Sequence, residues 1–213
     1  MKNYVTEFIG TFFLVLTIGL SVLSGTPLAP LAIGAALMVM VYMGGHVSGA
    51  HYNPAVTLAV VLRGKLPSRE LVPYWISQLL GSLVASFAVH LLVGRTFAPA
   101  PGPGVPAAAA LLGEVLFTLA LALVVLNVAT LAMTAGNSYY GLAIGFTVTA
   151  GAWAVGPISG GAFNPAVGTG PIIMSALWGA EGFGDLWLYW VGPLIGAALA
   201  AFVFRFQHGA AAN

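Results

Sequence analysis

One nine-residue stretch occurs twice in the sequence, and each copy interrupts a long apolar segment. Residues 48–56 read SGAHYNPAV, and residues 159–167 read SGGAFNPAV. The copies are identical at six of nine positions and start 111 residues apart. The same offset carries the run LAIG at 31–34 onto LAIG at 142–145. The chain is therefore built from two related halves.

Each copy predicts a loop that turns into a short helix. Asn53 and Asn164 are good helix N-caps, and the proline after each is favoured at the first helical position, where its missing N–H would be unpaired anyway. Apolar residues follow, at 55–62 and at 166–178. Helices of roughly 10–14 residues are too short to cross a hydrocarbon core of about 30 Å. Irregular backbone is tolerated at that depth only where protein or a water-filled path covers it, so two such helices indicate a pore.

The two Asn-Pro-Ala boxes, each closing an apolar segment, resemble those of the aquaporin family of water and small-solute channels, as does SGAHY before the first box. Two boxes at matched positions are far more specific than one, and the resemblance covers almost the whole chain. It implies an all-α membrane protein with six transmembrane helices and two re-entrant half-helices in an inverted repeat. It also implies a homotetramer with one pore per subunit. The implied pore residues are Asn53, Pro54, Ala55, Asn164, Pro165 and Ala166.

Composition places the chain in a lipid bilayer. Of its 213 residues 60% are hydrophobic and 5% are charged, whereas a soluble domain carries about 25% charged residues. The absence of cysteine excludes a disulfide, a thiolate nucleophile and a zinc–thiolate site. A net charge of +1 without a basic patch gives no indication of nucleic acid binding. We expect no cofactor and no metal.

The apolar segments predict six membrane spans, at 4–24, 28–44, 71–94, 107–133, 141–155 and 186–206, with loop and half-helix segments at 45–63 and 156–178. We expect one channel domain over 1–213, with a first repeat at 1–95, a proline-rich connecting loop at 96–106 and a second repeat at 107–208. Three spans per half is an odd number, so the halves must have opposite orientations in the membrane. The first span follows Lys2 as a signal peptide would, but its counterpart in the second half leads us to expect that it is retained.

Basic residues set the expected orientation. With both termini in the cytoplasm, five of the six Lys and Arg residues lie inside and only Arg95 lies outside, as the positive-inside rule requires. The five are Lys2, Arg63, Lys65, Arg69 and Arg205. The low charge and short connections favour a prokaryotic inner (plasma) membrane.

The two asparagines are the expected centre of selectivity. A helix N-terminus presents unpaired N–H groups and a partial positive charge. Two such ends facing each other would repel a cation, a hydrated proton included, but not a neutral dipole. The resemblance implies that Asn53 and Asn164 donate hydrogen bonds to the passing molecule. Each alone could be an ordinary cap, but a matched pair on an inverted repeat favours the pore role.

Glu7 and Glu114 lie inside predicted spans, where a carboxylate is costly and is a functional hypothesis by default. A proton relay is one interpretation. The other is that each carboxylate accepts hydrogen bonds from the irregular backbone of a re-entrant loop. Their matched placement favours loop bracing, as does the resemblance. His51 has no histidine counterpart in the second half, which argues against a metal site, and the resemblance implies that it lines the cytoplasmic vestibule or braces the loop.

The outer constriction departs from the family pattern. Family members usually carry arginine after the second box, but here Val167 repeats Val56. The resemblance places the other constriction residues at Ile33, Ala152 and Gly161, and water-selective members have an aromatic residue and a histidine at the first two. A wider apolar ring admits the carbon face of a polyol, and the missing arginine removes a fixed charge and a fork of donors. We expect a channel for water, glycerol, urea or ammonia, with arsenite as its neutral hydroxide, other metalloid acids and organic arsenicals as further possibilities.

Other interpretations remain open. Tyr189 and Trp190 resemble the aromatic pair of water-type members, although they weigh less than residues that touch the permeant. A secondary transporter also uses inverted repeats with broken helices, but no midplane acid could serve as its coupling-ion site. A closed-pore membrane scaffold or adhesion protein would assemble without conducting. An enzyme is not expected, because no nucleophile–base–orienter set is visible.

Overall fold

The computed structural model describes residues 1–179 and 182–209, and this part of the chain is helical without strands. Six helices in it are long and apolar enough to cross a membrane. They are α1 (Lys2–Leu23), α2 (Ala29–Ser48), α4 (Leu71–Val93), α5 (Ala107–Ala129), α6 (Tyr140–Ser159) and α8 (Leu188–His208). Two short helices, α3 (Pro54–Leu62) and α7 (Pro165–Leu177), have 9 and 13 residues. Two single turns of 3₁₀-helix follow α3 and α5, η1 (Ser68–Glu70) and η2 (Ala132–Thr134). The predicted fold class of six spans and two half-helices is confirmed.

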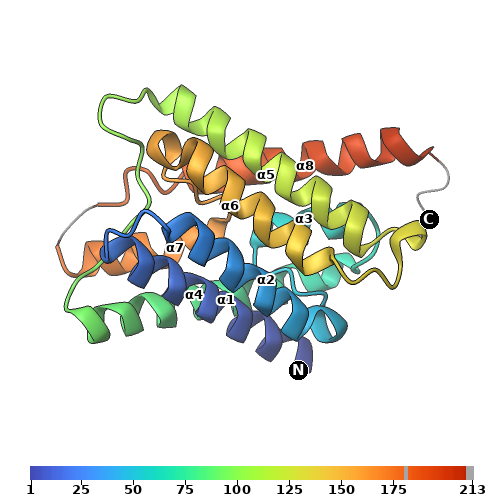
Figure 1. Ribbon diagram of the computed structural model, residues 1–213, viewed down its shortest axis with the longest axis horizontal. Coiled ribbons are helices and arrows are strands. Elements are labelled where there is room, and N and C mark those ends of the chain that lie inside the picture. Colours follow the sequence, from blue (N-terminus) through green and yellow to red (C-terminus); the bar gives the residue numbers. More distant parts are fainter. Residues whose placement is uncertain (180–181, 210–213) are drawn as a thin grey trace.

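The helices pack in two matching sets (Figure 1). α1 packs against α2 and α4, and α5 packs against α6 and α8 in the same way. The two sets meet where α2 packs on α6. Each short helix packs on a long helix of the other half, α3 on α8 and α7 on α4. This exchange is the arrangement that an inverted repeat produces, and it ties the halves together.

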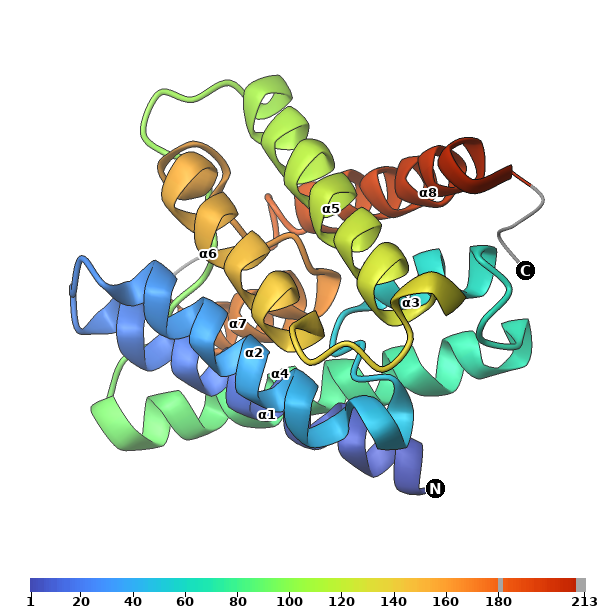
Figure 2. The same ribbon diagram turned by 45° about the vertical axis from the view of Figure 1, so that its right-hand side comes forward.

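The two ends of the bundle carry different segments. The start of α1 and the end of α8 lie at one end, together with the connection after α3 (Figures 1 and 2). We call this end the terminal face. The linker 94–106 between α4 and α5 lies at the opposite end, which we call the linker face. α3 runs from the middle of the bundle toward the terminal face, and α7 runs toward the linker face.

Helices α2 and α6 each run four residues beyond the predicted spans, which ended at 44 and 155. Both end at a serine, Ser48 or Ser159, followed by a glycine with φ of +88°, Gly49 or Gly160. Glycine ends a helix in this left-handed conformation without a Cβ clash. Gly44 and Gly45, which precede Ser48, are accommodated within α2. α5 is shorter than expected and ends at Ala129, because residues 132–134 form a separate turn.

Small residues let the long helices approach closely. A Cβ at Gly81 of α4 would lie 2.5 Å from the carbonyl oxygen of Phe8 in α1. A Cβ at Gly196 of α8 would lie at the same distance from the carbonyl oxygen of Val115 in α5. Close backbone approach at small residues is how helices associate in lipid, where the hydrophobic effect gives no drive between them.

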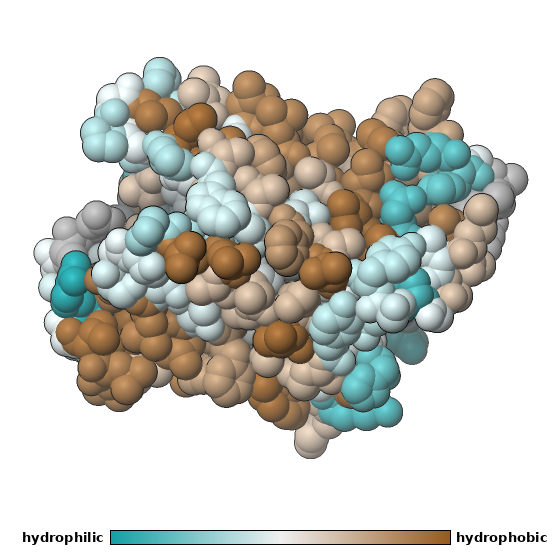
Figure 3. All heavy atoms as spheres, viewed as in Figure 1, coloured by the Kyte–Doolittle hydropathy of each residue, from teal (hydrophilic) through white to brown (hydrophobic). Residues whose placement is uncertain are grey.

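The outer surface suits lipid. Hydrophobic side chains cover much of the side of the bundle in Figure 3, and hydrophilic residues gather toward the terminal face. Large apolar side chains such as Leu91 and Phe202 are 68% and 69% exposed. In water a surface of this kind would aggregate, whereas in a bilayer it faces acyl chains.

Candidate pore

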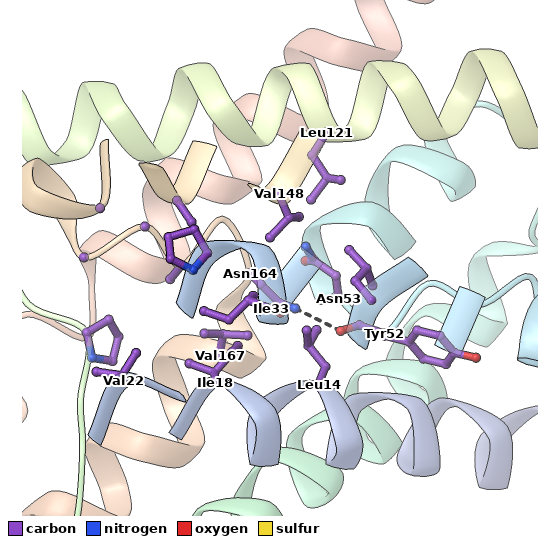
Figure 4. A pocket seen from close by; sticks show the side chains of 18 of the residues that line it. Leu14, Ile18, Val22, Ile33, Tyr52, Asn53, Leu121, Val148, Asn164 and Val167 are labelled. Atoms are coloured by element: carbon purple, nitrogen blue, oxygen red, sulfur yellow. Dashed lines mark hydrogen bonds between the residues drawn. The ribbon is translucent and has the colours of Figure 1, made fainter. Parts of the chain in front are cut away.

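A cavity of about 380 Å³ lies between the linker face and the N-termini of both short helices (Figure 4). At the linker face its walls come from residues 97–100 and from the start of α2. At its inner end lie Asn53 and Asn164. Most of the remaining wall is apolar, with Leu14, Ile18, Leu121 and Val148 among the side chains drawn in Figure 4. The cavity therefore offers a molecule polar partners mainly at its inner end.

A second cavity of about 410 Å³ opens at the terminal face and is lined by Asn3, Lys65 and Tyr74, among others. Two residues, His51 and Val125, line both cavities. They stand where the two cavities adjoin, beside the start of α3. We expect a path through the bundle to run through both cavities, with its narrowest point at these two side chains.

Asn53 and Asn164 cap the two short helices, which begin where the sequence predicts. Asn53 Oδ1 accepts hydrogen bonds from the backbone N–H of Ala55 at 2.8 Å and of Val56 at 3.4 Å. Asn164 Oδ1 accepts from the N–H of Ala166 at 2.9 Å. The prolines and alanines of the two boxes are buried in the first helical turns, and only the asparagines of these boxes line the cavity. Capping fixes each amide so that its oxygen faces the helix and its nitrogen faces away.

The nitrogen of each asparagine bonds to the other half of the chain. Asn53 Nδ2 donates to the carbonyl oxygen of Phe163 at 2.8 Å, and Asn164 Nδ2 donates to that of Tyr52 at 2.9 Å. Tyr52 and Phe163 have φ of 50° and 51°, a left-handed conformation that costs a non-glycine residue about 1–3 kcal/mol. This strained backbone turns each carbonyl toward the opposite asparagine. An amide NH₂ has two donors, so one proton on each asparagine remains for a molecule in the cavity.

Glu7 is fully buried under the first loop. Its Oε1 accepts from the hydroxyl of Ser48 at 2.7 Å and the backbone N–H of His51 at 2.9 Å. Its Oε2 accepts from the backbone N–H of Tyr52 at 2.6 Å and the side-chain amide of Gln78 at 2.8 Å. One carboxylate thus satisfies four donors, two of them from irregular backbone that no helix could pair.

Glu114 occupies the matching place under the second loop and is also fully buried. Its Oε1 accepts from the Ser159 hydroxyl at 2.7 Å and the N–H of Ala162 at 3.0 Å, and its Oε2 accepts from the N–H of Phe163 at 2.7 Å. Phe163 is the residue whose carbonyl accepts the hydrogen bond from Asn53 Nδ2. The carboxylate therefore holds the same peptide segment that completes the opposite asparagine.

The hydrogen bonds around Thr57 favour one tautomer of His51. The Thr57 hydroxyl donates its single proton to the carbonyl oxygen of Asn53 at 2.9 Å and accepts from the Gln78 amide at 2.9 Å. His51 Nδ1 lies 3.2 Å from this hydroxyl oxygen. Since the hydroxyl has no second proton to give, we assign the proton to Nδ1. Nε2 is then left as a hydrogen-bond acceptor on a ring that lines both cavities.

The four positions expected to form the outer constriction all line the linker-face cavity: Ile33, Ala152, Gly161 and Val167. Figure 4 draws Ile33 and Val167 together with Asn164 among the residues that line this cavity. None of the four side chains can donate or accept a hydrogen bond. Tyr189 and Trp190 instead hold other elements, since Tyr189 donates to the Ser159 carbonyl at 2.7 Å and Trp190 to the Thr169 hydroxyl at 2.9 Å.

The linker forms part of the cavity wall, which nothing in its proline-rich composition indicated. The side chains of residues 97–100 line the cavity, and the N–H of Gly102 donates to the carbonyl of Ile158 at 3.1 Å. A Cβ at Gly160 would lie 2.8 Å from the backbone nitrogen of Ala100, so only glycine leaves room for the linker there. Composition marks a loop but does not tell where the loop packs. Val125, which joins the two cavities, was also not foreseen, because it resembles any other apolar residue of α5.

Comparison with known proteins agrees with this architecture. Residues 1–204 match the family model described as "Major intrinsic protein". The chain is 36% identical over 215 residues to "Aquaporin NIP1-1" of Zea mays, covering 96% of this chain and 74% of that protein. It is also 36% identical over 219 residues to "Glycerol uptake facilitator protein-like 6" of Lactiplantibacillus plantarum, covering 96% and 97% of the two chains.

Among solved structures, the fold is similar to the "X-ray structure of the aquaglyceroporin from Plasmodium falciparum", with a TM-score of 0.83 over 95% of this chain and 94% of that one. The sequence identity there is 23%, so this likeness bears on the fold alone. The family match spans α1, α2, α4, α5 and α6 in full and α8 as far as residue 204, together with both short helices and both asparagine caps. The chain therefore belongs to the major intrinsic protein (aquaporin) family, whose members are membrane channels for water and small solutes.

Proposed function

We propose that this channel is a permissive one, which passes water together with small neutral solutes such as glycerol, urea or ammonia. The observation that carries the proposal is the ring of Ile33, Ala152, Gly161 and Val167, which lines the cavity without a single side-chain hydrogen-bond donor. A ring without donors has no means of holding water in preference to a polyol, whose carbon face suits an apolar wall. The names of the relatives include both an aquaporin and a glycerol facilitator, so they do not decide between the two classes.

Hydrogen bonds to the permeating molecule are then made at the centre of the pore. The free amide protons of Asn53 and Asn164 can donate to a hydroxyl or carbonyl oxygen of the permeant, and His51 Nε2 can accept a proton in a hydrogen bond. The N-termini of α3 and α7 add partial positive charge at the same depth. Since no arginine stands in the ring, exclusion of protons and other cations rests on these two helix ends.

Loop bracing is the role we propose for Glu7 and Glu114. Four donors reach Glu7 and three reach Glu114, and most belong to the loops that carry the asparagines. A proton relay would need a continuous chain of exchangeable groups along the pore, whereas neither carboxylate lines either cavity. His51 shares the bracing through Thr57 and also presents its ring to the pore.

We propose further that the terminal face is cytoplasmic, since Lys2, Arg63, Lys65, Arg69 and Arg205 all belong to segments at that end and Arg95 follows α4 at the linker face. The two repeats at 1–95 and 107–208 would then be oppositely oriented in a prokaryotic inner membrane. A homotetramer with a pore in each subunit is the assembly we propose.

Stopped-flow light scattering on proteoliposomes tests the proposal by comparing water and glycerol flux for the native chain, Val167→Arg and Val167→Met. Methionine fills a similar space without charge or donors, so it separates narrowing from the effect of the guanidinium. We expect the native chain to pass both solutes, the arginine variant to lose most glycerol flux, and the methionine variant to lose less. Native vesicles that pass water alone would contradict the wide-ring proposal. Flux no greater than in empty liposomes would favour the closed-pore scaffold, and saturable, gradient-coupled uptake would favour a transporter.

Arsenic compounds are more specific candidate solutes within the class of small neutral molecules. Arsenite as its neutral hydroxide presents oxygens for the asparagine amides, and an organic arsenical adds a methyl group that suits the apolar ring. Uptake of arsenite and of a methylated arsenical into the same vesicles, measured as total arsenic, would rank them against glycerol. Uptake that Val167→Arg leaves unchanged would show that the ring does not select among these solutes.

A further inference from the structure

A buried arginine that pairs with no carboxylate in residues 1–179 and 182–209 lies at the terminal face. Arg63 caps the C-terminus of α3 and is only 8% exposed. Its guanidinium carbon lies 4.8 Å from the centroid of the Phe204 ring in α8, a cation–π contact. Its Nε is buried and has no hydrogen-bond partner in the part of the chain that the structure describes. A buried guanidinium nitrogen without a hydrogen-bond partner is costly, so a bound anion would stabilise this arrangement.

No carboxylate in the described residues pairs with this charge. Within residues 1–179 and 182–209 one ion pair occurs, between Arg69 and Glu70 with a closest N–O distance of 3.8 Å. The charged neighbour of Arg63 is instead a second cation, Arg205 on α8. Burial first, and the charge of Arg205 second, lower the pKa of the Arg63 guanidinium. Arg63 lies over Phe204 and Arg205 bonds to Leu62, so the two arginines are neighbours, and in the described residues no carboxylate pairs with either.

The position of Arg205 adds to this pattern. Its guanidinium donates a hydrogen bond to the carbonyl oxygen of Leu62, the last residue of α3, and its side chain is exposed. The C-terminus of α3 offers a partial charge of only about half an electron, which cannot balance two guanidinium groups. Figure 2 shows the end of α3 beside α8, as their packing requires.

The surroundings of this pair are those of a membrane surface. Phe202 and Phe206 on the same turns of α8 are 69% and 85% exposed, as side chains that face acyl chains would be. Arg63 caps the C-terminus of α3 and Arg205 lies in the last turn of α8, so both belong to the terminal face. A lipid phosphate at this depth would have its tails alongside the phenylalanines and its charge beside the guanidinium groups.

We propose that Arg63 and Arg205 form a binding site for the phosphate group of an anionic phospholipid. Guanidinium forks bind phosphate oxygens in pairs, and basic pockets between transmembrane helices bind anionic headgroups. The site lies at the far end of the half-helix that begins at Asn53, so a bound lipid fastens that helix to α8 from outside the pore. This site is independent of which solute the channel passes.

Native mass spectrometry of the full-length protein in detergent tests the site, with phosphatidylglycerol and phosphatidylcholine of matched chains titrated in parallel. We expect the first phosphatidylglycerol to bind at least fivefold more tightly than phosphatidylcholine. Arg63→Gln and Arg205→Gln should each remove most of that preference. Arg69→Gln is the matched control, because this arginine lies at the same face but its side chain is 83% exposed and paired with Glu70; it should keep the preference.

Two further arms make the result decisive. Glycerol 3-phosphate at millimolar concentration is the soluble phosphate probe, and failure to displace phosphatidylglycerol supports the lipid as ligand. Displacement that depends on Arg63 would overturn the lipid assignment in favour of a soluble phosphate ester. Equal phosphatidylglycerol binding by the native chain and Arg63→Gln would overturn the site itself. If Arg63→Gln does not survive size-exclusion chromatography, Arg205→Gln and Arg63→Lys carry the test, and unchanged binding in both would refute the proposal.

Discussion

Replacing Glu7 or Glu114 by glutamine tests whether these carboxylates brace the pore loops. Glutamine keeps one acceptor oxygen and turns the other into a donor. A serine hydroxyl or a side-chain amide can rotate to face the new donor, but a backbone N–H cannot. Each carboxylate oxygen of Glu7 accepts from one backbone N–H, that of His51 or that of Tyr52. Either placement of the glutamine therefore leaves one buried backbone donor without an acceptor.

The cost follows from the number of orphaned donors. A hydrogen bond to a charged group contributes about 1.5–3 kcal/mol, so Glu7→Gln should destabilise the protein by roughly that amount. Glu114→Gln should cost the same, because its oxygens also accept from one backbone N–H each. Alanine removes both acceptors, which raises the expected loss to roughly 3–6 kcal/mol. For a chain of this length a loss of about 1 kcal/mol in unfolding free energy lowers the thermal unfolding midpoint by roughly 2–4 °C. Each glutamine variant should therefore lower that midpoint by roughly 3–12 °C.

Size-exclusion chromatography after heating the detergent-solubilised protein measures these midpoints. Glu70→Gln is the matched control, since Glu70 accepts from the Tyr4 hydroxyl and pairs with Arg69 at the surface, where such contacts contribute about 0–1 kcal/mol. Glutamine variants at 7 and 114 that melt with the native chain would refute the bracing argument. Proton flux into liposomes, changed in those variants without loss of stability, would support the proton relay instead.

Three other substitutions have definite expected outcomes. Val125→Ala should raise glycerol flux more than water flux, because it removes bulk where the two cavities adjoin; stopped-flow traces with unchanged glycerol flux would argue against a narrow point there. Gly81→Ala should sharply reduce assembled protein on size-exclusion chromatography, since its Cβ would meet a backbone oxygen at 2.5 Å, whereas Gly156→Ala, with nothing within 4 Å, should not. Asn164→Ala removes the cap of α7 and should lower the stability of the protein by about 0.5–2 kcal/mol. It should also raise the proton leak that a pH dye measures in liposomes. An unchanged leak would show that the cap does not contribute to cation exclusion.

The sequence predicted those parts of the molecule that depend on neighbours along the chain. Both short helices begin at an asparagine followed by proline because capping is local chemistry. The predicted end of the second span at residue 44 was wrong, because α2 continues to Ser48 and the left-handed Gly49 ends it.

What could not be predicted depends on partners far away in sequence. The bond from Asn53 to the Phe163 carbonyl spans 110 residues, and no local pattern reveals it. Arg63 was counted in the sequence only as a charge that orients the chain. Its burial over Phe204 appears once α3 and α8 are packed together. Likewise, the contribution of residues 97–100 to the cavity wall depends on how the linker packs in the folded protein.

The exchange of hydrogen bonds between the two asparagines has a consequence for biosynthesis. When the first half of the chain leaves the ribosome, the amide of Asn53 has no acceptor, because the carbonyl that it needs belongs to a residue 110 positions later. At about 5–20 residues per second, that acceptor is made on the order of ten seconds afterwards. Until then the Asn53 amide lacks its native acceptor and must bond to water or to another group instead. The hydrogen bonds at the centre of the channel can therefore form only after the second half of the chain has been made and inserted.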